Sequence, residues 1–411
     1  MGEPVKCALR PTPPPPAAAL PGAVLTGRRE GRLSSRRRRA APRHPGILGS
    51  WYPLTTASTT PGRDGWARLV WTTTLVAGAL ATGLFGLVLA LDPYGTRAGP
   101  GRAPTPIMEV NQRLMYPQLA RSGLFDSAVF GTSTVRLLEP VRLAASFGGR
   151  FANLGMNGAT PWEQLRMAEL FLRHVPAPAT IVMGLDRSWC DGEADREGKR
   201  LTFRSFPEWL FDEDPSNDVA GAFSLHALEL AGRVALNRLG IMRERVRGDG
   251  YENFLPPDIR YDPVRARRHI LDPTEHGTDL APPVPASDGR LGFPAIRWLE
   301  GFLARLPPVT RTVLILPPVH VAAQAMPGTA DEGVELACKA RLAAVAGAHG
   351  ATLVDYRLPS PITREDANYW DKLHYRLPVA EGLMGSLEAI ILAGGGDDPA
   401  GRYRVLSAGP R

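Results

Sequence analysis

Short apolar runs alternate with longer amphipathic stretches between about residue 105 and residue 393. Each of five runs is apolar at nearly every position, as in a strand buried on both faces, and most are followed by a turn-forming residue. Strands that alternate with helices in this way are typical of βαβ units. We therefore predict an α/β domain with a three-layer, doubly wound parallel sheet over 105–393. Its strands are expected at Ser127–Phe130, Phe151–Gly155, Thr180–Leu185, Thr312–Leu316 and Thr352–Tyr356.

The helical stretches between these strands differ in how clearly they begin. Thr160 and Glu163 form a capping box, and proline stands at the first helical position between them. A connection of about 120 residues follows the third strand and contains one long helical pattern over 219–246. Because ordinary connections are far shorter, we expect a helical insertion over 190–300 that lies beside the sheet as a lid or subdomain. A flexible insertion is the alternative for residues 187–215 and 257–289. The Gly-rich and charged tail 394–411 is expected to be disordered.

One apolar run near the N-terminus is longer than any strand. Residues 69–91 carry no charged side chain, and about 20 apolar residues are enough to cross a bilayer as a helix. A cleaved signal peptide and a buried core helix are the alternatives. The run exceeds the usual apolar core of a signal peptide, and no convincing cleavage site precedes Asp92. The sequence therefore predicts one transmembrane helix over 69–91.

Charge is distributed unevenly along the chain and gives the expected orientation of this helix. The 68 residues up to Arg68 contain twelve Lys and Arg against three Asp and Glu, whereas the remainder carries 36 against 38. Positive charge on one side predicts a cytoplasmic N-terminus and an extracytoplasmic domain at the inner (plasma) membrane. The tail 1–65 is rich in proline, alanine and arginine and is expected to be disordered. It lacks interleaved aromatic residues, so no nucleic-acid partner is expected.

Cysteines are few and scattered. Cys7 lies in the tail, and Cys190 and Cys338 lie in the domain. Two of them can pair outside the cytoplasm, but three scattered cysteines make no disulfide framework and have no metal-ligand spacing. We expect free, mostly buried thiols, and neither a metal nor a cofactor.

Residues that follow the strands carry the candidate chemistry, because ligands of open parallel sheets bind at the carboxyl ends of the strands. Ser133 follows the first strand in the sequence GTST, and NYWDKLHY, late in the chain, contains Asp371 and His374. A serine becomes a nucleophile when a histidine accepts its proton and a carboxylate orients that histidine. We predict these three residues as a catalytic triad. The alternatives are a helix-capping serine and a surface ion pair.

Three further residues are candidates for holding the oxyanion or the substrate. Asn157 and Gly158 follow the second strand, where a side-chain amide and a backbone N–H can donate to an oxyanion. Asp186 follows the third strand and is a candidate for a substrate contact or for a packing role. His320 follows the fourth strand, and we interpret it as a loop residue rather than a second base.

The motifs VFGTST, FANLGMNGATPWEQ, GLDRSW and NYWDKLHY, together with DPYG after the apolar helix, resemble the SGNH (GDSL-like) hydrolase superfamily. They look most like its membrane-anchored branch, which includes proteins of alginate O-acetylation and of D-alanyl transfer to teichoic acid. The resemblance spans about residues 92–392 and implies a flavodoxin-like sheet, with Ser133 as nucleophile, His374 as base and Asp371 as its orienting carboxylate. Thr132 stands where the superfamily usually has aspartate, and Asp186 where it usually has an oxyanion asparagine.

The resemblance implies a membrane-anchored serine esterase or O-acyltransferase. Its substrate would be an acylated extracytoplasmic polysaccharide or another cell-envelope ester, and a membrane protein that donates the acyl group would be a partner. The departures at Thr132 and Asp186 motivate an alternative. In that alternative, the chain is a non-catalytic envelope protein that keeps the fold as a glycan-binding or scaffold module.

Overall fold

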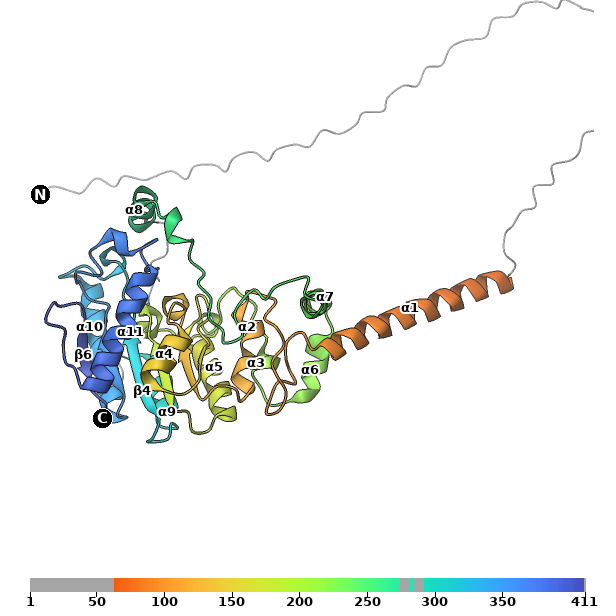
Figure 1. The fold of residues 1–411 in the computed structure, drawn as a ribbon, viewed down its shortest axis with the longest axis horizontal. Coiled ribbons are helices and arrows are strands. Elements are labelled where there is room, and N and C mark those ends of the chain that lie inside the picture. Colours follow the sequence, from red (N-terminus) through yellow and green to blue (C-terminus); the bar gives the residue numbers. More distant parts are fainter. Residues whose placement is uncertain (1–62, 274–280, 284–291, 410–411) are drawn as a thin grey trace, which may run out of the picture. The chain divides into compact units, whose positions relative to one another are not determined.

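The computed structural model describes residues 63–273, 281–283 and 292–409. This part of the chain forms an α/β domain around a six-stranded sheet, from which helix α1 projects (Figure 1). The strands are β1 (Ser127–Phe130), β2 (Phe151–Asn153), β3 (Thr180–Gly184), β4 (Arg311–Leu316), β5 (Thr352–Asp355) and β6 (Arg404–Ser407). The helices are α1 (Arg63–Leu91), α2 (Gln112–Met115), α3 (Pro117–Arg121), α4 (Pro140–Phe147), α5 (Pro161–His174), α6 (Pro215–Ala222), α7 (Leu225–Arg238), α8 (Pro263–Leu271), α9 (Pro294–Leu303), α10 (Ala330–Ala348) and α11 (Leu377–Ala393).

The sheet has the strand order β2-β1-β3-β4-β5-β6, and the pairs among β1 to β5 are all parallel. The five predicted strands are thereby confirmed. The chain order reverses direction between β1 and β3, which is the point where open sheets of this kind bind ligands. The turns after β1 and β3 lie at this point, and they carry Ser133 and Asp186.

Helices cover both faces of the sheet and give it three layers. Along each strand, alternate side chains enter two different cores. On one face Phe130 and Met183 pack with residues of α5, α9 and α10. On the other face Val129 and Val182 pack with residues of α4 and α11. The predicted capping box at the start of α5 is present, with Thr160 and Glu163 each accepting from the other's backbone N–H.

The C-terminal tail differs from its prediction. Within 394–411, which was expected to be disordered, β6 pairs antiparallel with β5, so the sheet is mixed rather than purely parallel. The strand is short and half-exposed, and its stability comes from pairing and from the contacts of Val405 and Leu406 with the two cores. These interactions are non-local, so composition alone does not reveal them.

The insertion after β3 also differs from its prediction, in its helices and in its C-terminal boundary. The pattern over 219–246 is not one helix, because α6 and α7 meet at a bend of 85°. Ser224 caps the start of α7 by accepting from Ala227 N–H, and the left-handed Gly240 follows its end. In addition, α9 belongs to the layer that covers the sheet, so the insertion ends before Pro294 rather than at residue 300.

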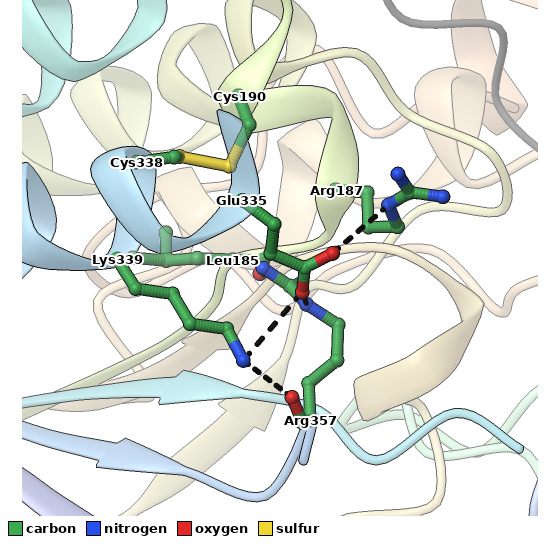
Figure 2. The surroundings of a disulfide bond; sticks show 7 residues. All are labelled: Leu185, Arg187, Cys190, Glu335, Cys338, Lys339 and Arg357. Atoms are coloured by element: carbon green, nitrogen blue, oxygen red, sulfur yellow. Dashed lines mark hydrogen bonds and ion pairs between the residues drawn. A yellow bond between two sulfur atoms is a disulfide. The ribbon is translucent and has the colours of Figure 1, made fainter. Parts of the chain in front are cut away.

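The expectation of free thiols in the domain is wrong. Cys190 and Cys338 form a disulfide with a Cα–Cα distance of 5.6 Å (Figure 2). Cys190 ends a short 3₁₀ helix, Arg187–Cys190, and Cys338 lies on α10, which packs against it. The two residues are 148 positions apart, so only the folded chain reveals their proximity.

Helix α1 is long and apolar enough to cross a membrane. It contains the predicted span 69–91, and large apolar side chains such as Trp71, Leu75 and Leu80 are exposed along it. The tail 1–65, predicted to be disordered, lies outside the described residues except for its last three.

Candidate functional site

The nucleophile candidate Ser133 lies on a sharp turn at the carboxyl end of β1. It begins a 3₁₀ helix, Ser133–Val135, and Thr132 accepts a hydrogen bond from Thr134 N–H there. Gly131 has a φ of +148°, and a Cβ at this position would approach Val135 Cγ2 to 2.7 Å. Glycine is therefore required for the chain to turn this tightly beneath the serine.

Ser133, His374 and Asp371 form a continuous hydrogen-bonded chain. His374 Nε2 lies 2.8 Å from Ser133 Oγ, and His374 Nδ1 lies 2.7 Å from Asp371 Oδ2. The structure thus brings together residues separated by 241 positions, as the sequence motifs predict. A carboxylate at Nδ1 favours the tautomer with the proton on Nδ1, so that Nε2 is left to accept the serine proton.

A tight loop presents the histidine and its carboxylate. Trp370 N–H donates to His374 O at 2.9 Å and closes the loop. Asp371 Oδ1 accepts from the N–H groups of Leu373 at 2.7 Å and His374 at 2.9 Å. Burial alone would raise the pKa of Asp371, but the hydrogen bond to the His374 ring and these backbone donors lower it below its usual value. Asp371 therefore stays ionised and holds the imidazole in place.

The segment after β2 lies against the turn that carries Ser133. Met156 N–H donates to Gly131 O at 2.9 Å, and a Cβ at Gly155 would lie 3.2 Å from Thr132 O. Gly158 follows with a φ of +57° and open space beside its Cα. This contact brings the predicted oxyanion donors to the same end of the sheet as Ser133.

Asn157 is held with its amide hydrogens available. Arg136 Nη1 donates to Asn157 Oδ1 at 2.7 Å, which fixes the orientation of the side-chain amide and leaves Nδ2 as its donor end. Its backbone is held as well, because its N–H donates to Gln112 Oε1 at 3.2 Å and its carbonyl accepts from Arg113 Nη1 at 3.1 Å. Asn157 can therefore donate to an oxyanion or a substrate oxygen through Nδ2.

Asp186 lies behind the turn that carries Ser133 and bonds to it through Thr134. Thr134 Oγ1 donates to Asp186 Oδ1 at 2.8 Å, while Oδ2 is buried without a hydrogen-bond partner in the described part of the chain. Burial raises the pKa of this carboxyl, and the hydroxyls of Thr132 and Thr134 oppose that shift. These contacts are those of a residue that positions the segment around Ser133.

Arg136 and Phe254 belong to the site but were missed from the sequence. The Arg136 guanidinium lies 4.9 Å from the centroid of the Phe254 ring and forms an ion pair with Glu252. The Phe254 and His374 rings pack edge to face, with their centroids 5.6 Å apart. Residues 252–254 lie in the insertion, where no motif relates them to the distant histidine.

His320 is a structural residue, in agreement with its interpretation as a loop residue. Its Nδ1 accepts from Ala322 N–H at 3.1 Å, and its Nε2 bonds to Asp366 Oδ1 at 3.0 Å. Its backbone N–H donates to Lys372 O at 2.9 Å. Through this bond, His320 ties the loop that carries Asp371 and His374 to the end of β4.

A buried ionic cluster fixes the segment after β3 (Figure 2). Arg357 Nη1 donates to Leu185 O at 2.8 Å, and its Nε donates to Glu335 Oε1 at 2.9 Å. Burial would raise the pKa of Glu335, but Arg357 and Lys339 lower it below its usual value. The Cys190–Cys338 disulfide closes the same region from the other end of the 3₁₀ helix. Cluster and disulfide together hold the segment that contains Asp186.

Within residues 63–273, 281–283 and 292–409, no group of three His, Cys, Asp or Glu side chains is placed to hold a metal ion. The arrangement around Ser133 places a hydroxyl, an imidazole and a carboxylate in one hydrogen-bonded chain. Comparison with models of known protein families finds no match, and comparison with curated proteins finds no similar sequence.

Proposed function

We propose that this chain is a membrane-anchored serine esterase or O-acyltransferase that acts through an acyl-serine intermediate. The substrate class is an extracytoplasmic glycan or another cell-envelope ester. One observation carries the proposal, namely the hydrogen-bonded chain from Ser133 Oγ through the His374 ring to Asp371. This arrangement activates a hydroxyl for attack on a carbonyl carbon.

Membership of the SGNH superfamily is part of the same proposal. Two features support it. The nucleophile candidate follows the first strand of a sheet whose five parallel strands have the order β2-β1-β3-β4-β5, and the aspartate and histidine come from one loop near the C-terminus. The segment after β2, which includes Asn157 and Gly158, lies against the nucleophile turn, as an oxyanion-binding block requires.

The proposed reaction has two half-steps. Ser133 Oγ bonds to the acyl carbon of the ester while its proton passes to His374 Nε2, and the leaving alkoxide then takes that proton. This leaves an acyl-serine. Water or an acceptor hydroxyl next attacks the acyl carbon and gives its proton to His374, which passes that proton to Ser133 Oγ as the bond between Oγ and the acyl carbon breaks. Asp371 stabilises the imidazolium in both half-steps, which its lowered pKa permits.

Donors around the site would stabilise the tetrahedral oxyanion. The Ser133 N–H stands at the start of its 3₁₀ helix, and the Asn157 amide is oriented by Arg136. A carboxylate at position 186 replaces the asparagine donor of the superfamily, and one lost oxyanion donor typically costs about 2.7–4 kcal/mol. Asn157 Nδ2 is the group that we propose in its place.

Two features support an extracytoplasmic domain. A disulfide persists in oxidising compartments, and the Cys190–Cys338 bond is of the buried, structural kind. The positive charge before α1 favours a cytoplasmic N-terminus. The domain would therefore face substrates of the cell envelope.

The test uses the full chain in detergent with an activated acetyl ester. We expect acetate release by the wild type and at least a 10³-fold loss in Ser133→Ala, whereas the exposed control Ser205→Ala should match the wild type. Equal release by all three proteins would contradict an acyl-serine mechanism. If an acylated polysaccharide then bound without turnover, and bound equally to Ser133→Ala and His374→Ala, the chain would be a binding module instead.

A further inference from the structure

Helix α7 has two apolar faces, although a helix at a protein surface normally has one. Its inner face, which includes Leu230 and Val234, is buried in the domain core. A second stripe follows the positions i, i+3, i+11 and i+14 and consists of Leu225, Leu228, Leu236 and Leu239. Leu225 is 87% exposed and Leu239 is 72% exposed, whereas Leu228 is partly buried against the core, so the stripe faces away from the domain at its two ends. We call it the outer face of α7.

Two further apolar side chains extend the outer face at its ends. Phe223, at the bend between α6 and α7, is 67% exposed, and Ile241 beyond the end of α7 is 70% exposed. Single exposed apolar residues are normal, but a row of them along one helix marks a contact with an apolar partner. The chain within the described residues provides no such partner for Leu239 and Ile241, which both remain mostly exposed.

The outer face begins where α1 ends. The centroid of the Phe223 ring lies 4.7 Å from that of the Phe85 ring of α1, in an edge-to-face arrangement. Leu225 and Leu228 line one groove together with Phe85 and Val88 of α1. In Figure 1, α7 is seen along its axis beside the end of α1, while α1 is seen along its length. α7 therefore runs crosswise to α1.

The level of this contact along α1 can be estimated from helix geometry. Phe85 lies six residues before Leu91, which at 1.5 Å per residue places it about 9 Å inside the end of the helix. The end itself is polar, because Arg97 donates to Leu89 O and Arg238 donates to Leu91 O at 3.4 Å. Phe223 and Leu225 thus lie on the apolar side of two guanidinium groups.

We propose that the outer face of α7 lies in the boundary between headgroups and acyl chains of the bilayer that α1 crosses. Interfacial helices bury their apolar face about 5–10 Å deep and carry cations at the headgroup level, which is the arrangement of Phe85, Arg97 and Arg238 here. The partner is a phospholipid surface. The inference depends on α1 crossing the membrane and not on the proposed catalysis.

The contact would fix the orientation of the domain. A single helix leaves a domain free to tilt and rotate, whereas a second element in the interface plane removes most of that freedom. The loop that carries Asp371 and His374 would then be held at a constant distance from the membrane surface.

The experiment measures the depth of α7 in the full chain, reconstituted in vesicles of phosphatidylcholine and phosphatidylglycerol. Cys7→Ser removes the third cysteine of the sequence, and Cys190 and Cys338 do not react with a thiol label because they are paired in the disulfide. In this background, Leu225→Cys, Leu239→Cys or Ile259→Cys adds one thiol for an NBD label. Ile259 is the matched control, because it is apolar, 94% exposed and shortly before α8 in the chain, and α8 lies far from α1 in Figure 1.

We expect nitroxide-labelled acyl chains to quench the labels at 225 and 239 about threefold more than the label at 259, and aqueous iodide to show the reverse order. The control reports any affinity of the label itself for lipid. Resistance to alkaline extraction verifies in the same samples that α1 is inserted. If iodide quenches all three labels equally while α1 stays inserted, the outer face is in water and the proposal is wrong. An outer face that serves a protein partner would give this same result in vesicles of the purified chain.

Discussion

Removing the Cys190–Cys338 disulfide should destabilise the domain strongly and act on the segment behind the candidate active site. The bond links the 3₁₀ helix after Asp186 to α10 and closes a loop of about 148 residues. The chain-entropy relation for a loop of this length gives about 5 kcal/mol at 25 °C, and strain or residual structure reduces it in practice. We therefore expect the free energy of unfolding to fall by about 2–5 kcal/mol.

Urea unfolding of four samples measures this effect. The oxidised wild type, the wild type reduced with dithiothreitol, the double variant Cys190→Ala/Cys338→Ala and the control Cys7→Ala are compared. Reduction keeps both sulfur atoms in the core, so the reduced wild type isolates the cross-link, and the double variant adds the loss of packing. The double variant should not respond to dithiothreitol, and Cys7→Ala should behave as the wild type.

Equal urea midpoints for oxidised and reduced wild type would contradict a stabilising effect of the cross-link. Such a result would mean that the ionic cluster of Arg357, Glu335 and Lys339 holds the segment by itself. Acetate release from the activated ester, measured in the same samples below the unfolding transition, tests whether the segment that carries Asp186 moves when the bond opens.

Three further predictions concern single side chains. Asp371→Asn should lower kcat by about 10³- to 10⁴-fold with little change in KM, because an amide favours the wrong imidazole tautomer, and steady-state kinetics with an unchanged kcat would argue against the triad. Glu163→Gln should cost about 3–5 kcal/mol in urea unfolding, because it leaves the fully buried Arg113 without its anionic partner, whereas Glu169→Gln on the surface should cost less than about 1 kcal/mol. Burial raises the pKa of Asp218 from 3.8 to about 6, so the folded state binds its proton more tightly and stability falls as pH rises from about 4 to about 6. Asp218→Asn should weaken that fall and raise the Tm at pH 7, and an unchanged difference in Tm between pH 4 and pH 7 would contradict this cause.

The parts of the fold that local patterns predict are those with strong local signals. The runs that become β1 to β5 are apolar on both faces. The start of α5 is marked by a capping box, in which Thr160 and Glu163 are only three positions apart. β6 has no such signal, since Val405 and Leu406 gain their order from pairing with β5. The bend between α6 and α7 depends on Ser224, whose capping role competes with a continuous helical pattern.

The candidate site divides in the same way. Ser133, Asp371 and His374 could be proposed because each follows a strand or stands in a short motif, and chemistry requires all three types together. Arg136 and Phe254 could not, since a buried arginine and an aromatic residue have many structural roles, and only the folded chain places them beside His374.

The disulfide was missed because pairing across 148 residues leaves no trace in spacing. Asp186 was identified by its place after β3. The sequence could not reveal that its carboxyl bonds to Thr134 behind the nucleophile.

Covalent labelling of the full chain by a fluorophosphonate shows whether Ser133 is an activated nucleophile. An activated serine displaces fluoride from the probe and forms a bond between Oγ and phosphorus, which peptide mass spectrometry locates. We expect an adduct on Ser133 that forms rapidly in the wild type, at least about 100-fold more slowly in His374→Ala and not at all in Ser133→Ala. An unlabelled wild type, or an adduct on another residue that survives in Ser133→Ala, would contradict it.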